Sequence, residues 1–480
     1  MKNIALRNTV LGLILGAWCN YAVAHNAADH GLMIKIKYEG RNQIKDLKNA
    51  GYDITGIDLE NGFIDIILNN EADAELLVNK TNLNIVSKTA LNPEFAPDSD
   101  YKTPDEIVEI FTQFANDYPG ITELEVIGQT VQGRDILALK ITDNPQEREL
   151  DEPGILFNAM HHAREIMTPE VIIDTAEFLL TNYGTDAAVT SWVDSNEIWL
   201  VPQVNPDGNN KVWTKDSYWR KNLGAKGRGV DLNRNYPYEW NGCGGSSGSV
   251  WSDTYRGPSA GSEPETQALM RLVARTQPVF NISYHSYSEL VLYPYGCDGE
   301  RTPTREIVEG VGIEMAKLII KDSGRGTYKP GTPWDILYAV DGSDSDWMYN
   351  EYQVIPYVVE LNSSSQGFQP KYKWRQPTVE KMRPAWGLLL DKLSGSGVRG
   401  VIRDNSGRAN PNATITVASL GDNLLASNTM NVKPDGTYHL ILLPGMYNIS
   451  FNQNGEIIEK EVTIGDTRVD LDIDFAAVAH

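Results

Sequence analysis

Two side chains that could bind a metal ion lie three residues apart in the segment 157–170, which reads FNAMHHAREIMTPE. His162 and Glu165 follow an apolar run typical of a buried strand, and they precede Thr-Pro-Glu, which is typical of a helix start. At the mouth of a strand-to-helix turn, an imidazole and a carboxylate at this spacing can face one point. Catalytic zinc usually has three protein ligands and an open position, so the pair could supply two of them. A surface His-Arg-Glu cluster in a loop is the alternative for so short a pattern.

A third ligand has to come from a small set, because the chain contains only seven histidines. His285, in NISYHSY, follows the apolar beginning of a predicted strand and is the natural partner for His162 and Glu165. His161 adjoins His162, but neighbours on an extended chain point to opposite faces, so His161 is expected to pack inside or face solvent. His439 lies in an alternating strand and is expected to be structural.

Helices alternate with short, mostly apolar strands over the middle of the chain. Helices are predicted at 103–114, 169–183 and 378–393, the first opening with a Thr-Pro-Asp-Glu capping box. The alternation predicts an α/β sheet covered by helices on both faces. Such sheets bind ligands at the carboxyl ends of their strands, which is where the candidate metal ligands fall.

Two smaller units are predicted on either side of a main domain at 96–395. Residues 25–95 combine short strands with two helical segments, which is an α+β pattern. Residues 397–480 contain short strands separated by Gly, Pro and Asn turns, which predicts a small all-β sandwich. The sequence Ser-Gly-Ser-Gly at 394–397 predicts a flexible hinge before this sandwich.

The composition limits the possible partners and compartments. A net charge of −22 over 480 residues, with no basic patch, argues against a nucleic-acid partner. Of the three cysteines, Cys19 falls in the N-terminal segment and Cys243 and Cys297 fall in the main domain. These two could pair in an oxidising compartment or remain free buried thiols.

The N-terminus is typical of a secretory signal at residues 1–24. Lys2 and Arg7 precede an apolar core at 10–18, and Ala-Val-Ala at 22–24 offers a cleavage site. The apolar run is short for the alternative, a membrane anchor. The sequence therefore predicts a secreted or periplasmic protein with no membrane anchor once the signal is removed.

Five ordered motifs resemble those of the zinc metallocarboxypeptidases of the carboxypeptidase A family. They are HARE, WRK, DLNRN, HSYSELVLYPYG and DWMYN, the last followed by Glu360. The resemblance covers roughly residues 98–395 and is nearest to the secreted bacterial branch typified by carboxypeptidase T. It implies a mixed twisted sheet flanked by helices, one catalytic zinc ion, and hydrolysis at the C-termini of peptides and proteins.

The resemblance also implies roles for the residues that would carry the chemistry. The HARE and HSY motifs make His162, Glu165 and His285 the zinc ligands. Glu360 matches the general base that takes a proton from the attacking water and later gives it to the leaving amine. Arg220 of WRK matches the side chain that polarises the scissile carbonyl.

Five further positions match substrate-binding residues of the family. Asn233 and Arg234 match the pair that grips the terminal carboxylate of the substrate, and Arg164 matches a subsite arginine. Tyr338 matches the mobile tyrosine that closes on the substrate, and Ser345 falls at the bottom of the specificity pocket. Because Gly296 and two aspartates, Asp341 and Asp344, fall nearby, a broad preference for apolar and basic C-terminal residues is expected.

The flanking units resemble parts of the same family by pattern and position. Residues 25–95 resemble an activation segment that covers the cleft until it is cut away, and the C-terminal sandwich resembles transthyretin-like or regulatory-like domains. The uncut chain is accordingly expected to be a nearly inactive zymogen. Calcium is a further possibility at the acidic loop containing Glu147, Glu149, Asp151 and Glu152, although such loops are usually just solvated.

Two other functions compete with a peptide carboxypeptidase. A zinc peptidase that trims peptidoglycan stem peptides would use the same metal on a different substrate. A non-catalytic peptide-binding protein would need neither Glu360 nor Arg220, so the presence of both residues argues against it.

Overall fold

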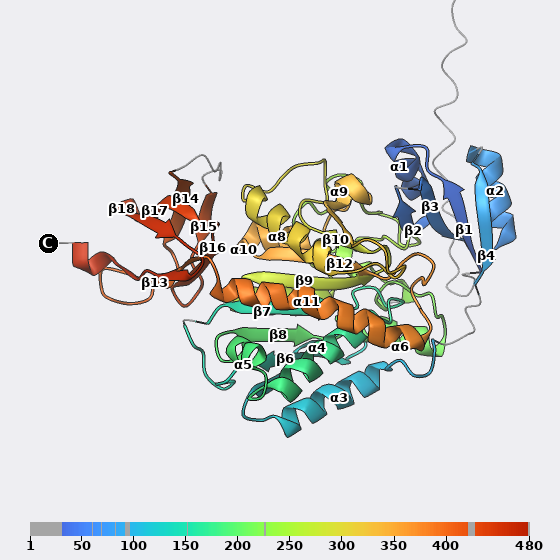
Figure 1. Ribbon diagram of the computed structural model, residues 1–480. Helices are drawn as coiled ribbons and strands as arrows, with labels where there is room; N and C mark the ends of the chain where they lie inside the picture. The colour runs from blue at the N-terminus through green and yellow to red at the C-terminus, as the bar shows by residue number, and fades with distance from the viewer. Residues whose placement is uncertain are drawn as a thin grey trace, which may run out of the picture.

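The computed structural model describes residues 31–478 except 60, 69, 82, 92–96, 151, 225, 226 and 421–427. The predicted signal peptide lies outside these residues. Figure 1 shows a small N-terminal unit in blue, a central sheet flanked by helices and a small C-terminal unit in red. The predicted α/β architecture with a mixed sheet is confirmed. No helix among the described residues is both long enough and apolar enough to span a membrane.

The central sheet has eight strands in the order β11-β10-β12-β9-β7-β8-β6-β5. Their bounds are β5 Thr122–Gln129, β6 Asp135–Ile141, β7 Gly154–Ala159, β8 Glu197–Val201, β9 Phe280–Ser286, β10 Leu290–Leu292, β11 Lys329–Gly331 and β12 Ile355–Leu361. The four central strands β12, β9, β7 and β8 run parallel to one another. Their carboxyl ends therefore meet at one edge of the sheet, and the segments that follow them lie close together there.

Helices cover both faces of this sheet (Figure 1). Their bounds are α3 Pro104–Asp117, α4 Thr168–Asn182, α5 Ala187–Val193, α6 Pro206–Thr214, α7 Pro264–Thr276, α8 Arg305–Leu318, α9 Pro333–Ile336, α10 Asp344–Tyr352 and α11 Arg375–Ser394. Ile155 and Phe157 of β7 share a core with α3, α4, α8 and α11, whereas Leu156 between them packs in the core of α7 and α10. Alternate side chains of one strand thus bury on opposite faces, as two-sided burial of a parallel sheet requires.

The N-terminal unit is a four-stranded sheet with two helices. Its elements are β1 Leu32–Lys37, α1 Arg41–Asn49, β2 Asp53–Asp58, β3 Phe63–Leu68, α2 Glu71–Thr81 and β4 Ile85–Ala90, with strand order β2-β3-β1-β4. Strand β2, which lies between the two helices in sequence, was not predicted. The apolar core of the unit includes Leu290, Leu337 and Val358 of the central domain, so the two units bury apolar surface against each other.

The C-terminal unit consists of two small sheets. Its strands are β13 Gly397–Arg403, β14 Thr414–Ser419, β15 Asn428–Asn431, β16 Thr437–Ile441, β17 Gly445–Gln453, β18 Glu456–Ile464, β19 Arg468–Asp470 and β20 Ile473–Asp474. Of the hinge predicted at 394–397, only Gly395 and Ser396 separate α11 from β13. Ser396 Oγ donates a hydrogen bond of 2.7 Å to the carbonyl of Gly465. Val398 and Ile402 of β13 belong to the same buried core as α8 and α11.

Candidate active site

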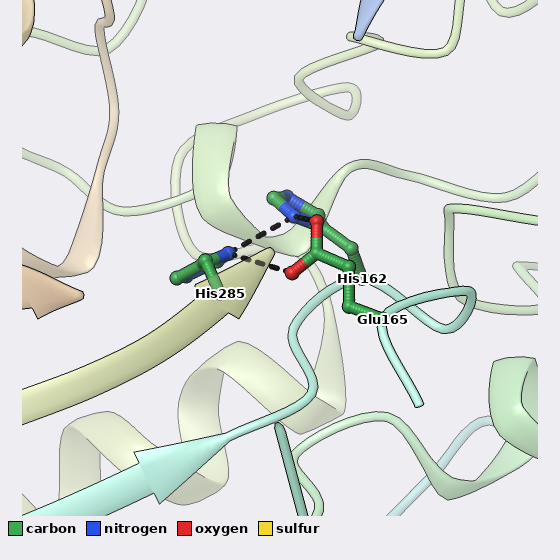
Figure 2. Close-up of side chains that lie close together, drawn as sticks. All are labelled: His162, Glu165 and His285. Carbon is green, nitrogen blue, oxygen red and sulfur yellow. Dashed lines mark hydrogen bonds and ion pairs between the residues drawn. The ribbon is translucent and has the colours of Figure 1, made fainter. Parts of the chain in front are cut away.

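The three predicted metal ligands converge at the carboxyl edge of the central sheet (Figure 2). His162 and Glu165 lie in the turn between β7 and α4, and His285 lies near the end of β9, the parallel neighbour of β7. His162 Nδ1 is 2.8 Å from Glu165 Oε1, and His285 Nδ1 is 3.1 Å from both His162 Nδ1 and Glu165 Oε2. Ligand atoms bound tetrahedrally to zinc at about 2.0–2.1 Å are separated by roughly 3.3 Å. The donor set and its spacing therefore fit a zinc ion.

The protonation states of these ligands are set by burial and by one another. Burial, followed by the charge of Arg220, lowers the pKa of His162 and favours the neutral imidazole that binds metals. Burial opposes ionisation of Glu165, but His162 and His285 outweigh it and hold the pKa of this carboxyl well below its usual range. Burial lowers the pKa of His285, and Glu165 and Glu360 reverse the effect and raise it. The carboxyl of Glu165 is thus held in its ionised form, which is the form that binds a metal ion.

A further buried carboxylate, Asp231, contacts this cluster, and its role was not predicted from the sequence. Its Oδ1 lies 3.1 Å from His162 Nε2, and its Oδ2 accepts hydrogen bonds of 3.1 and 2.8 Å from Nε and Nη2 of Arg220. A carboxylate on the outer nitrogen of a metal-binding imidazole fixes the tautomer and orientation of the ring. The sequence offered one indication of this role, because Asp231 is the first residue of the DLNRN motif that also contains Asn233 and Arg234.

Substituting Asp231→Asn is expected to weaken zinc binding by about 10–100-fold, because the amide cannot hold the His162 ring as the carboxylate does. Competition with a chelator of known affinity measures the effect. The exposed Asp298→Asn is the matched control. Equal zinc affinity of the wild-type protein and the Asp231 variant would contradict this role.

Glu360 and Arg220 line the same cleft as the three candidate metal ligands. Glu360 of β12 is in register with His285 of β9. Burial raises the pKa of Glu360 to about 8, His285 opposes the shift, and Glu165 adds to it. The Arg220 guanidinium is buried, with Nη1 3.9 Å from Glu165 Oε1. A carboxyl group whose pKa lies near neutrality can both accept a proton and return it.

Asn233 and Arg234 lie in a short 3₁₀ helix, Leu232–Arg234. The Asn233 side chain is already engaged, with Nδ2 3.3 Å from His285 Nε2 and Oδ1 accepting a 2.9 Å hydrogen bond from the backbone N–H of Asp344. Arg234 is only 2% exposed, and its hydrogen bonds go to two backbone carbonyls. No carboxylate of the described residues forms an ion pair with it. Arg234 is thus a buried cation available to an incoming carboxylate.

A cleft of about 50 Å³ joins these groups. It is lined by every predicted site residue except Arg164, namely His162, Glu165, Arg220, Asn233, Arg234, His285, Tyr338, Ser345 and Glu360. The lining also includes the apolar side chains of Leu292, Leu337, Val340 and Val358, and Ser343, whose hydroxyl lies 3.3 Å from that of Ser345. Asp341, Asp344 and Gly296, which were expected to shape the pocket, are not among its lining residues. The carboxylate of Asp341 instead accepts a 2.9 Å hydrogen bond from the backbone N–H of Gly245.

Arg164 is paired with the N-terminal unit rather than placed in the cleft. Its Nη1 and Nη2 donate hydrogen bonds of 2.6 and 3.2 Å to the two carboxylate oxygens of Asp53 in β2. The guanidinium carbon lies 4.1 Å from the centre of the Phe368 ring. Arg164 and Asp53 are both buried, so this ion pair is shielded from solvent.

The N-terminal unit also reaches the cleft itself. Thr55 lines the cleft, and its hydroxyl lies 3.1 Å from the hydroxyl of Tyr287. Lys48 Nζ donates a 3.0 Å hydrogen bond to the carbonyl of Ala339 and lies 3.9 Å from the centre of the Tyr338 ring. The unit therefore covers the side of the cleft where Tyr338 lies.

The acidic loop before β7 brings together Asp143, Glu149 and Glu152, each with a carboxylate oxygen within 4.8 Å of the others. Burial raises the pKa of Glu152 to about 8. Glu147 is exposed and outside this cluster, and Asp151 lies outside the described residues. Calcium at this loop stays a prediction.

Comparison with known proteins gives a consistent result. A model of the family described as zinc carboxypeptidase matches residues 107–385. Zinc carboxypeptidase A 1 of Anopheles gambiae is 32% identical over 308 residues, which cover 62% of this chain and 69% of that protein. A zinc carboxypeptidase of Saccharothrix mutabilis subsp. capreolus is 34% identical over 288 residues, 56% of this chain and 64% of that protein. Carboxypeptidase D of Mus musculus is 29% identical, but the match spans only 25% of its length.

Solved structures share the fold. The carboxypeptidase A of Helicoverpa armigera superposes with a TM-score of 0.65 at 20% identity, covering 75% of this chain and 96% of that one. Thrombin activatable fibrinolysis inhibitor superposes with a TM-score of 0.63 at 22% identity, covering 76% of this chain and 98% of that one.

Proposed function

Because the chain belongs to the zinc carboxypeptidase family and is a peptidase, we propose that it removes the C-terminal residue from peptides and proteins. The observation that carries this proposal is the position of Arg234. A buried guanidinium without an ion-pair partner among the described residues lines the same cleft as a cluster of two histidines and a glutamate. Its planar fork suits bidentate binding of a free carboxylate, so the enzyme would recognise the end of a chain.

The remaining side chains divide the reaction between them. His162, Glu165 and His285 would hold zinc, which when bound lowers the pKa of the attacking water to about 7. Glu360 would accept a proton from that water and return it to the leaving amine. Arg220, held by Asp231, would stabilise the negative charge that develops on the scissile carbonyl oxygen. The fixed position of Arg220 means that little reorganisation is required as this charge grows.

The test of an exopeptidase compares peptides with free and amidated C-termini. The free acid is expected to be cleaved and the amide to be nearly inert. Substituting Arg234→Lys should lower kcat/KM on the free acid by about 10–100-fold, mainly through KM, because one charged hydrogen bond of the fork is lost. Equal rates on the two peptides, or an unaffected Arg234 variant, would contradict the proposal.

We further propose that apolar C-terminal residues are accepted best. The lining by Leu337, Val340 and the serines Ser343 and Ser345 supports apolar ends. A panel of peptides that end in Phe, Leu, Arg and Glu measures the preference. Faster cleavage of the peptides that end in Arg or Glu than of those that end in Phe or Leu would overturn it.

We also propose that the enzyme is secreted as a zymogen. The disulfide between Cys243 and Cys297 supports export, since disulfides persist in oxidising compartments. The N-terminal signal predicted at residues 1–24 is consistent with it. The contacts of Lys48, Asp53 and Thr55 with the cleft and with Arg164 support an inhibitory role for the N-terminal unit.

A further inference from the structure

A second cleft, of about 80 Å³, lies between the central domain and the C-terminal unit. The central domain contributes Val279, Ile307 and Ile355, and the C-terminal unit contributes β16 and the turn before it. In Figure 1 the red C-terminal unit sits beside α8, α10 and the adjoining end of the sheet. Val279 and Ile355 lie at the amino ends of β9 and β12, whereas the candidate active site lies at their carboxyl ends. This interdomain cleft is therefore separate from the active site.

The interdomain cleft contains a buried ammonium group without a partner. Lys433 lines the cleft, is only 7% exposed, and its Nζ has no hydrogen-bond partner among the described residues. Burial, followed by the charge of Arg148, lowers the pKa of Lys433 to about 8. Lys433 is therefore protonated in most molecules at pH 7. An unpaired buried charge destabilises the folded protein, so an anion that pairs with Lys433 would relieve this cost and bind favourably.

The two carboxylates whose charges act on Lys433, Asp435 and Glu197, are both paired with Arg148. Asp435 Oδ2 accepts hydrogen bonds of 3.1 and 2.8 Å from Nε and Nη2 of Arg148. Asp435 Oδ1 accepts from both the backbone N–H and the hydroxyl of Thr437. Glu197 forms an ion pair with the same arginine. These acids do not form an ion pair with Lys433.

His439 adds a second unsatisfied polar group to the same cleft. Both of its ring nitrogens are buried without a hydrogen-bond partner among the described residues. Burial, followed by the charges of Lys433 and Arg468, keeps the pKa of His439 well below its ordinary value. The imidazole is therefore neutral and can donate one N–H to an anion, in a region where the surrounding charges are positive.

We propose that the interdomain cleft binds a small organic carboxylate with an apolar body, the carboxylate pairing with Lys433 and accepting a hydrogen bond from His439. The apolar body would rest on the rest of the lining, formed by Val279, Ile307, Ile355, Val417, Met430, Leu440 and Leu442. A volume of about 80 Å³ holds several water-sized groups and so limits the ligand to a short chain. Such a ligand would contact both units and stabilise their association.

Isothermal titration of the intact chain with 4-methylpentanoate tests this site. The uncharged 4-methylpentan-1-ol and zwitterionic L-leucine have the same carbon skeleton and serve as matched probes. The acid is expected to bind one site per chain, at least 10-fold more tightly than the alcohol. Lys433→Met and His439→Gln should each weaken binding of the acid by 10-fold or more, without changing peptidase activity. Arg234→Met identifies any binding of the acid at the active site. This substitution removes the guanidinium that would bind a carboxylate there and leaves the interdomain cleft unchanged.

The outcomes separate clearly. Weaker binding in each of the Lys433 and His439 variants that folds, with binding retained in the Arg234 variant, supports the proposal. Unchanged binding in a folded Lys433 or His439 variant would overturn it. Leucine bound as tightly as the acid would identify the ligand as a free amino acid, and weaker leucine binding would identify an acid without an ammonium group. Absence of binding, equal binding of the alcohol, or loss of binding in the Arg234 variant alone would overturn the proposal. Peptidase activity is assayed separately, so that failure of the proposed function remains distinguishable.

Discussion

Substituting Glu360→Gln is expected to lower kcat by about 10²–10⁴-fold while zinc stays bound. The amide matches the carboxylate in size but cannot accept a proton from water or return one to the leaving amine. None of the three candidate metal ligands is changed. The measurement is kcat on a peptide with a C-terminal leucine, together with the zinc content of the purified variant.

Glu152→Gln provides a matched control for this substitution. Glu152 is also a buried carboxyl whose pKa is raised to about 8, but it lies in the acidic loop and does not line the active-site cleft. Its variant is expected to keep the wild-type kcat. A Glu360 variant that retains zinc and full activity would show that another group serves as the base.

Cutting the chain between the N-terminal unit and the central domain is expected to raise activity by about 100-fold or more. In the intact chain, the N-terminal unit covers the cleft near Tyr338 and engages Arg164 through Asp53. Once the linker is cut, the N-terminal unit is no longer held at the roughly millimolar effective concentration that a short linker provides, so it dissociates at enzyme concentrations about 100-fold lower. Limited proteolysis, with activity and fragment mass followed over time, measures the release.

Asp53→Ala tests the same contact without a protease. The uncut variant is expected to be more active than the uncut wild-type chain, because the unit is held less tightly over the cleft. Asp46→Ala, an exposed position on α1 of the same unit, is the control and should change nothing. Full activity of the wild-type chain before any cleavage would contradict the zymogen proposal.

Local signals explain what the sequence predicted well. His162 and Glu165 share one turn, and His285 lies near the end of an apolar strand, so the HARE and HSY motifs were enough to name all three ligands. The capping box at Thr103 predicted the start of α3 in the same way. Each of these features depends on residues that are adjacent in sequence or on a regular repeat of apolar side chains. The parallel pairing of β7 with β9 that brings the three ligands together was not predicted from the sequence.

The features that were not predicted from the sequence depend mainly on contacts between distant segments. The Arg164–Asp53 pair joins residues 111 positions apart, so nothing near Arg164 indicated that it would be taken up by the N-terminal unit. The pairing of Cys243 with Cys297 stayed open until the fold brought their Cα atoms to 5.7 Å. Strand β2 was missed because its DITGID sequence contains Gly and two acids and is buried on both faces rather than alternately.

Anomalous diffraction at the zinc absorption edge, on crystals of the purified protein, tests the central claim most directly. We expect one zinc ion bonded to His162, Glu165 and His285, with Glu360 beside the open coordination position. A zinc ion found elsewhere, or none at these three residues in a fully active preparation, would contradict it.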